Sequence, residues 1–251
     1  MPLRTDSSLW FNHPACIAAY QPVRGPDPLQ VRYNQAHGGD NRYKAVDVVV
    51  GTVWTGSVGW QFNISAYLNT GITFSGMPGY TAIARYVLGA SQVFSAVFGV
   101  RNAATMRFGL FGQYNSTDVN YGYGSTSAVI NPKASGVFAV TNYGYRNGVA
   151  ETTALTWADI SASLGMYIGA RNNNGSADYP FEGTIQAIAF FGRVLSSHEV
   201  SRTTRQMQYC DVNPDWSAWG RRRKWCLVTA EVPPPNLSVS IGGSGGDVVI
   251  V

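Results

Sequence analysis

The stretch GMYIGARNNNGSADYPFEGTIQAIAFFGRVLSSHEVSRTTRQM, residues 165–207, contains four predicted elements in close succession. Residues 167–169 are apolar and β-prone, which predicts a short strand. Residues 171–175 are rich in Asn and Gly, which tolerate positive φ, so they predict a turn. A second strand and a helix follow. We therefore expect the order strand, turn, strand and helix at the end of the folded domain.

The second strand and the helix each have their own signal. Residues 181–191 alternate in polarity, and the residues spaced for one face of a strand are Phe181, Ile185, Ala187, Ala189 and Phe191. Gly192 and Arg193 end this strand. Ser196, with Glu199 three residues later, forms a capping box that predicts a helix start.

This order resembles the closing segment of laminin G-like, concanavalin A-like jelly-roll domains. In that family a YIGA…F.G.I…F.R.LS..E run ends the sandwich and adds a short surface helix. Residues 54–62, WTGSVGWQF, resemble the family's W..G..G.AL.F strand pair, and residues 145–149, YRNGV, resemble its lYvNGv hairpin. Asn147-Gly148 in that hairpin predicts a type I′ turn. The resemblance covers roughly residues 16–209. It implies an all-β, antiparallel jelly-roll β-sandwich with one short helix. It also favours a binding or assembly module over an enzyme.

The rest of this region also predicts short strands, most of them separated by Gly, Asn or Pro. Residues 17–20 form an apolar opening strand that Pro22 ends, and residues 24–45 predict a long loop. The later strands are expected at residues 54–62, 67–74, 81–86, 92–100, 105–114, 118–123 and 137–145.

Composition favours one sandwich domain with a polar, weakly charged surface. The chain has 251 residues, 28 Gly, 13% aromatic residues and only 13% charged residues, about half the usual charged share. Such surfaces suit sugar-binding faces and proteins packed in large assemblies, and both settings stay open. The net charge of +4 is concentrated in RRRK at residues 221–224. We therefore do not expect general nucleic-acid binding.

Neither a secretory signal nor a membrane span is expected. The first ten residues, MPLRTDSSLW, have no apolar core, and no run of about 18 apolar residues exists. The three cysteines, Cys16, Cys210 and Cys226, are odd in number and lack metal-ligand spacing. They fit free buried thiols in a chain made in a reducing cytoplasm. A disulfide, such as Cys16 with Cys210, is the alternative.

We divide the chain into an N-terminal arm (1–15), a jelly-roll domain (16–209) and a C-terminal assembly tail (210–251). The tail has a stiff VPPP spacer at residues 232–235 and a Gly/Ser link at 242–246, and it ends in apolar residues. An apolar β-prone terminus is expected to add a strand to a neighbouring chain or to the edge of its own domain. Trp and Arg are favoured interface anchors. The predicted docking residues are Trp216, Trp219, Arg221, Arg223, Trp225, Val248, Val249 and Ile250.

No catalytic site is predicted. The glucanases of the resembling family carry an E.D..E run, which this sequence lacks. Asp178 and Glu182 would lie ~13 Å apart along a strand, whereas a glycosidase pair needs roughly 5 to 9.5 Å. The sequence has no GxSxG, Walker or zinc motif, and its histidines stand in no nucleophile motif.

Two kinds of ligand site are predicted. Laminin G-like domains often bind Ca²⁺ at the sandwich rim, so the resemblance implies a calcium site at Asp178, Asn172 and Asn174. The alternative is that this Asn cluster only makes turns. Exposed aromatic rings stack on sugars, and polar side chains bind their hydroxyl groups. The predicted carbohydrate site is Tyr114, Tyr121, Tyr123, Tyr143, Asn115 and Asn142. Its alternative is that these tyrosines are core or interface residues.

The sequence thus favours a non-enzymatic phage virion protein, in the capsid or the tail. An NP.W start followed by an arginine cluster resembles the tails of phage-encoded jelly-roll proteins. The lectin-like domain would face outward, toward host or environmental glycans, and the C-terminal tail would dock on other virion proteins. A homo-oligomer or a larger assembly is expected. The alternative function is a soluble glycan-binding module or a degenerate glycoside hydrolase.

Overall fold

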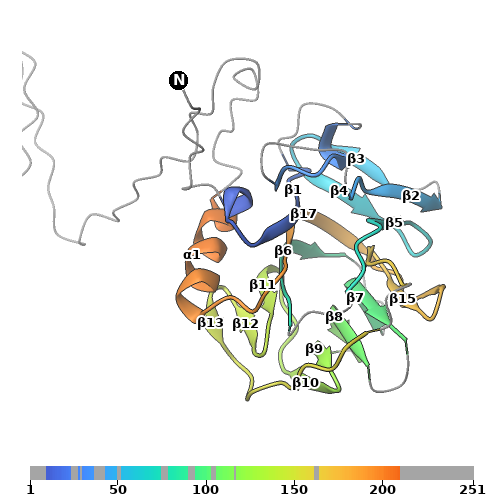
Figure 1. The fold of residues 1–251 in the computed structure, drawn as a ribbon. Coiled ribbons are helices and arrows are strands. Elements are labelled where there is room, and N and C mark those ends of the chain that lie inside the picture. The colour runs from blue at the N-terminus through green and yellow to red at the C-terminus, as the bar shows by residue number, and fades with distance from the viewer. Residues whose placement is uncertain are drawn as a thin grey trace, which may run out of the picture.

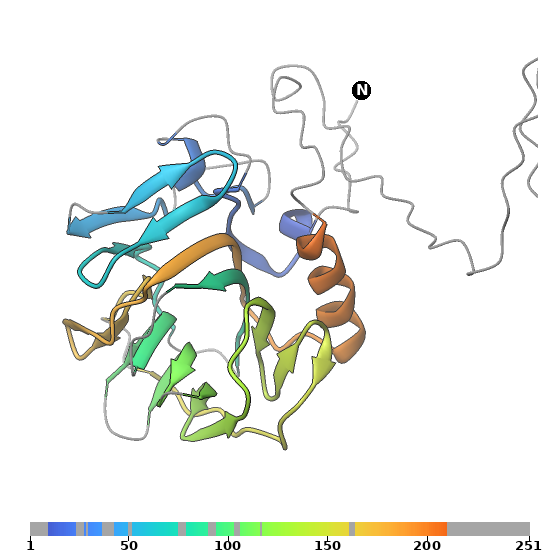
Figure 2. The ribbon, with the colours of Figure 1, turned by 180° about the vertical axis from the view of Figure 1, so that it is seen from behind.

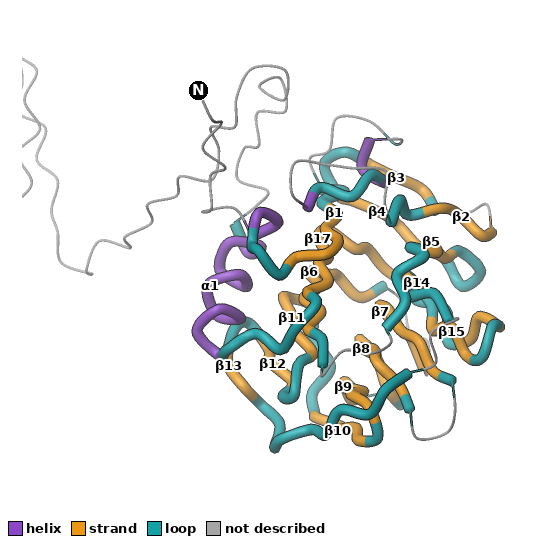
Figure 3. The backbone as a smooth tube through the Cα atoms, viewed as in Figure 1, coloured by secondary structure: helices purple, strands orange, loops and turns teal. Residues whose placement is uncertain are grey.

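The computed structural model is a sandwich of two β-sheets with one helix against it (Figure 1). It describes residues 10–23, 28, 30–36, 43–49, 52–74, 79–89, 94–102, 106–115, 117–160 and 164–209. The side chains of residue 30 and of residues 46–49 are not described. Figure 3 shows strands along nearly the whole length of the described chain. The predicted all-β fold with one short helix is confirmed for this part of the chain.

The first sheet has eight strands and is antiparallel throughout. Its order is β13 (Val149–Ala150), β12 (Gly144–Arg146), β11 (Gly136–Val140), β6 (Thr81–Leu88), β17 (Gly183–Phe191), β4 (Gly59–Phe62) and β3 (Val53–Thr55). The opening strand β1 (Cys16–Tyr20) pairs with β17. The last strand of the domain therefore lies in the middle of this sheet, beside the first.

The second sheet has nine strands. Its order is β10 (Thr126–Ile130), β9 (Asp118–Gly124), β8 (Arg107–Tyr114), β7 (Phe94–Arg101), β14 (Tyr167–Ile168), β5 (Tyr67–Asn69) and β2 (Val46–Val49). Two short strands complete it, β15 (Arg171–Asn173) and β16 (Ser176–Asp178). β15 runs parallel to β7, and the other pairings of this sheet are antiparallel.

The core between the sheets is built from aromatic and aliphatic side chains that both sheets contribute. Tyr20 and Trp60 lie 5.8 Å apart between ring centroids, and Phe98 and Phe108 lie 6.0 Å apart. Tilted and edge-on aromatic pairs at such distances add stabilisation beyond the area they bury. Because this core lies between the two sheets, the strands of both sheets have an apolar face that points toward it.

A second apolar layer covers the outer side of the eight-stranded sheet. Helix α1 (Ser197–Gln208) inserts Val200 and Met207 here, and the 3-10 turn η1 (Trp10–Asn12) adds Trp10, which is 2% exposed. Figures 1 and 2 both show α1 against this sheet. We call this surface the covered face. Because Trp10 packs in it, the described end of the predicted arm lies against the domain.

A β-bulge in β17 overturns one detail of the predicted strand. The register of β17 against β6 shifts between Ile185 and Ala187, because an extra residue is inserted. Phe181 and Ile185 therefore lie in the core between the sheets, whereas Phe191 lies in the covered face. The five residues predicted to share one face are split between two layers, and β17 is buried on both sides.

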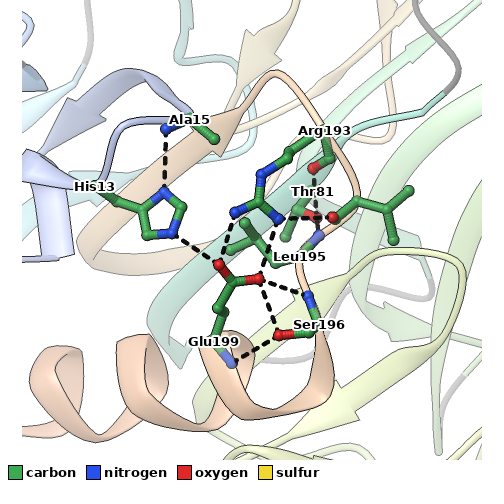
Figure 4. A network of polar contacts seen from close by, with 8 residues as sticks. His13, Ala15, Thr81, Arg193, Leu195, Ser196 and Glu199 are labelled. Atoms are coloured by element: carbon green, nitrogen blue, oxygen red, sulfur yellow. Dashed lines mark hydrogen bonds and ion pairs between the residues drawn. The ribbon is translucent and has the colours of Figure 1, made fainter.

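The capping box at the start of α1 is confirmed and is part of a larger polar network (Figure 4). The Ser196 backbone N–H donates to Glu199 Oε2 at 2.9 Å, and the Glu199 N–H donates to Ser196 Oγ at 3.3 Å. Arg193 Nη2 donates to Glu199 Oε1 at 2.6 Å, and His13 Nε2 lies 3.2 Å from the same oxygen. These bonds hold the pKa of Glu199 well below its usual value, the Arg193 contact being the largest cause. The network ties the helix start to the segment before β1.

Other predicted elements are confirmed in part. Asn147 and Gly148 have φ of 50° and 82°, as a type I′ turn requires. Residues 137–145, predicted as one strand, form two strands, β11 and β12. The break is stabilised by Thr141 Oγ1, which accepts a bond of 2.9 Å from the Tyr143 N–H. This turn was not predicted because its residues are β-prone.

Cys16 is fully buried in the covered face, and burial raises the pKa of its thiol. It is a free cysteine among the described residues. Cys210 and Cys226 lie outside the described residues, so their redox state stays a prediction. Within the described ranges, no helix has the length and apolar character needed to cross a membrane.

Candidate functional site

Tyr121 and Tyr123 do not belong to a carbohydrate site, although the sequence predicted them there. Their side chains are 0% and 1% exposed and belong to the core between the sheets. The Tyr121 hydroxyl donates to Glu151, and burial raises the pKa of Tyr123 to about 12. A ring enclosed on both sides cannot stack on a sugar, so the prediction is wrong for these two residues. The alternative, that strand tyrosines are core residues, holds for them.

The remaining predicted sugar-binding residues lie on different sheets. Tyr114 ends β8, and Asn115 follows it in the turn to β9 with φ of 56°. Asn142 and Tyr143 lie in the turn between β11 and β12, where the Tyr143 ring packs 6.3 Å from that of Tyr145, at the edge of the covered face. These residues do not form one site.

Two of the predicted calcium ligands, Asp178 and Asn172, form hydrogen bonds within the protein. Asp178 accepts two bonds from Arg171, from Nε at 2.8 Å and from Nη2 at 2.6 Å. The Asn172 side chain donates to Gly165 O and accepts from the Gly175 N–H, both at 2.8 Å, so it closes the turn. Asn174 has φ of 51° in this turn. The described residues hold no group of three His, Cys, Asp or Glu side chains that could bind a metal. Asn172 and Asn174 thus take part in the turn between β15 and β16, as the alternative proposed, and calcium binding here stays a prediction.

The predicted docking residues of the tail, Trp216, Trp219, Arg221, Arg223, Trp225, Val248, Val249 and Ile250, lie outside the described residues. Their role stays a prediction.

The outer side of the nine-stranded sheet presents a different set of side chains. Strand alternation points Leu68, Phe98 and Phe108 into the core, so their neighbours point outward. We call the resulting surface the tyrosine–arginine face. It is defined by Tyr67 on β5, Tyr167 on β14, Arg171 on β15, Arg101 on β7 and Arg107 on β8. In Figures 1 and 2, α1 and β15 lie on opposite sides of the molecule, so this face is remote from the helix.

A row of glycines forms the backbone floor of this face. Gly99 on β7 is in register with Gly109 on β8, which is in register with Gly122 on β9. The row leaves room for long side chains to lie along the sheet. A Cβ at Gly99 would stand 3.1 Å from Arg171 Cγ, and a Cβ at Gly122 would stand 3.0 Å from Arg107 Cδ. The glycines are therefore the reason that these two arginines lie across neighbouring strands.

Arg171 is held firmly in place. Besides its two bonds to Asp178, its guanidinium carbon lies 4.5 Å from the ring centroid of Tyr179 and 5.4 Å from that of Phe111. Cation–π contacts of this kind stabilise a desolvated arginine. The side chain is buried and its charge is paired, so Arg171 is a fixed part of the face.

Arg107 is held differently. It is in register with Arg101 across the β7–β8 pair, and its Nε is buried without a hydrogen-bond partner in the structure. Burial lowers the pKa of Arg107, and the charges of Arg101 and Arg171 lower it further. Like charges directly opposite each other on neighbouring strands are destabilising. Arg107 is therefore the member of the face with unused donor capacity among the described residues.

The tyrosine pair stands next to the arginines. The rings of Tyr67 and Tyr167 lie 4.8 Å apart between centroids, and Tyr67 is half-buried. Tyr167 is in register with Gly99, the residue over which Arg171 lies. Aromatic rings and guanidinium donors thus adjoin each other over a row of buried glycines. Such a set can bind a flat polar ligand, and it holds no pair of free carboxylates for acid–base chemistry.

Sequence reasoning missed this face although a signal is present. Residues 107–110, RFGL, and residues 120–124, NYGYG, alternate large apolar residues with Gly or polar ones. That period of two gives a core face and a face of small residues. We sought exposed tyrosines, whereas the tyrosines of NYGYG point inward.

Comparisons with known proteins bear on the fold. No protein-family model matches the sequence, and no curated protein matches it. Among solved structures, domain 4 of AbnA, an extracellular GH43 arabinanase from Geobacillus stearothermophilus, solved with arabinotriose, is similar with a TM-score of 0.54 and 16% identity. That match covers 75% of this chain and 98% of the arabinanase domain.

The ligand-binding domain of botulinum neurotoxin serotype D, solved with N-acetylneuraminic acid, matches with a TM-score of 0.50 and 9% identity, over 79% of this chain and 52% of that one. The NanB sialidase of Streptococcus pneumoniae matches at a TM-score of 0.43 and 17% identity, over 58% of this chain and 27% of the sialidase. The chain thus spans about a quarter of that sialidase. At these identities the matches to the arabinanase domain and the neurotoxin domain show a shared β-sandwich fold.

Proposed function

We propose that this protein is a carbohydrate-binding module that acts by binding and not by catalysis, with the tyrosine–arginine face as its binding surface. The observation that carries the proposal is the make-up of that face. It combines a tyrosine pair, guanidinium donors and a glycine floor on a sheet surface remote from α1.

The chemistry of the face fits sugars. A pyranose ring has an apolar side that packs on an aromatic ring and hydroxyl groups that need hydrogen-bond partners. Tyr67, which is half-buried, supplies the aromatic surface and packs against Tyr167, which is 8% exposed. The nearby arginines supply donors. The Asp178 carboxylate is bound by Arg171, which removes it from a catalytic role.

The shared fold adds support. The arabinanase domain was solved with arabinotriose and the neurotoxin domain with N-acetylneuraminic acid. These ligands belong to those proteins, but they establish that sandwiches of this shape can present a sugar site. This favours the glycan-binding module over a degenerate glycoside hydrolase.

The virion setting stays a prediction that rests on the tail sequence. A phage particle would carry the module outward, and the tail would attach it to other virion proteins or to further copies of the chain.

The test is a glycan array probed with the full chain, followed by two matched variants. Tyr67→Ala should lower the affinity for the best glycan by about tenfold, which corresponds to about 1.4 kcal/mol. Tyr143→Ala removes a half-buried tyrosine at the edge of the covered face and should leave the affinity unchanged. Loss of binding in Tyr143→Ala alone would place the site at the opposite sheet, and absence of any glycan binding would refute the proposal.

A further inference from the structure

We infer that the ligand of the tyrosine–arginine face is an anionic sugar, and that Arg107 binds its carboxylate or sulfate group. This inference rests on the proposed function and narrows it to one class of glycan. It follows from how positive charge is arranged on the face.

Three arginines gather on adjoining strands of one sheet face. Arg101 and Arg107 are directly in register, and Asn173, two residues after Arg171, is in register with Arg101. Neighbouring strands lie about 4.8 Å apart, so the side chains occupy a small area. A protein gains no stability by bringing like charges together on a sheet. Asp178 neutralises Arg171, and a bound anion would compensate the charge of Arg107 in the same way.

Two of the three arginines, Arg171 and Arg107, are held in different ways. Both carboxylate oxygens of Asp178 are engaged by Arg171, whose charge is thereby satisfied within the protein. The Nε of Arg107 is buried without a hydrogen-bond partner among the described residues, and its half-buried stem is positioned over Gly122. A guanidinium held in this way is preorganised, because the entropy cost of fixing the side chain has already been met by packing.

The position of the tyrosines indicates how such a ligand would lie. Tyr167 on β14 and Arg107 on β8 are separated by β7, which places them about 10 Å apart across the sheet. A short oligosaccharide spans this distance. One sugar ring would pack against the tyrosine pair, while the anionic group of the next would accept hydrogen bonds from Arg107.

The test uses the full chain and matched pairs of sugars that differ in one charged group. The affinities of 3′-sialyllactose and 3′-sulfolactose are each compared with that of lactose by calorimetry. Comparing 3′-sialyllactose with 3′-sulfolactose distinguishes binding of a carboxylate from binding of a sulfate. We expect the preferred anionic sugar to bind at least about tenfold more tightly than lactose. Arg107→Gln should reduce this preference to about twofold or less. The control Arg202→Gln makes the same charge change at an exposed position on α1 and should keep the full preference.

The outcomes separate the two proposals. Binding of lactose as tightly as both anionic sugars would overturn this inference and leave the glycan-binding function standing. Full retention of the anionic preference in Arg107→Gln would overturn the role of Arg107. Tighter binding of single-stranded DNA than of any sugar would overturn the anionic-sugar assignment in favour of a nucleic acid. Absence of binding to any array glycan would refute the function itself.

Discussion

The two outer faces of this sandwich show how one fold separates stability from recognition. On the covered face, α1 and η1 bury Phe191, Met207 and their neighbours, so the eight-stranded sheet is apolar on both sides. On the tyrosine–arginine face, the nine-stranded sheet carries glycines and arginines, which are residue types that contribute little to a hydrophobic core. Residues that do not help to stabilise the fold are expected at sites where a protein binds a ligand.

The difference follows from what each strand has to do. β17 is buried on both sides and is a nearly continuous apolar run. β8 and β9 are also buried over most of their length, but on the side away from the core they carry glycines and polar residues. Substitutions on the two faces should therefore separate cleanly into those that change stability and those that change binding.

The largest effect is expected on the covered face. Phe191→Ala should lower the free energy of unfolding by about 3–5 kcal/mol, because it leaves a cavity where a fully buried ring meets the helix layer. Chemical denaturation measures this. If the domain lost less than about 1 kcal/mol, the covered face would not be the stabilising layer described here.

A smaller effect is expected at the start of α1 and depends on pH. The pKa of Glu199 is lowered in the folded state, so its network stabilises the domain at pH values above the ordinary carboxyl value of 4.5 and loses that contribution as pH falls below it. Glu199→Gln should cost about 1 kcal/mol at pH 7, since the group is partly exposed.

Denaturation at pH 7 and pH 3 checks the sign of this effect. The gap in unfolding free energy between the wild-type protein and Glu199→Gln should narrow at pH 3. A gap that widened on acidification would contradict the role of the carboxylate.

The smallest effect on stability is expected at the glycine floor. In Gly122→Ala the new Cβ would stand 3.0 Å from the Arg107 side chain, which must shift by a few tenths of an ångström. The unfolding free energy should change by less than about 1 kcal/mol, because alanine also restricts the unfolded chain. The affinity for an anionic sugar should nevertheless fall, as calorimetry would show. Unchanged affinity would mean that the position of Arg107 does not matter.

Much of the covered face could be predicted from sequence, because it depends on local signals. The capping box at Ser196 and Glu199 and the Asn147-Gly148 turn are set by neighbouring residues, and both are confirmed. The bulge in β17 could not be predicted, since it depends on the register with β6. A shift of one residue moves every later side chain to the other face.

The candidate site was harder to predict for the same reason. Whether the Tyr121 side chain points into the core or outward depends on which face of β9 packs against the other sheet. The alternation of residues along β9 defines two faces but does not indicate which of them is buried. The cluster of Arg101, Arg107 and Arg171 forms only when β8 and β15 both pair with β7. No spacing within the sequence contains that information.

The most direct test of the account is to map the bound ligand on the full chain. Backbone amide NMR signals would be followed while 3′-sialyllactose is added. The account predicts that the largest shifts occur at β5, β7, β8 and β14, with α1 and β11 unaffected. Shifts centred on α1 and β11, or no shifts with either this sugar or lactose, would contradict it.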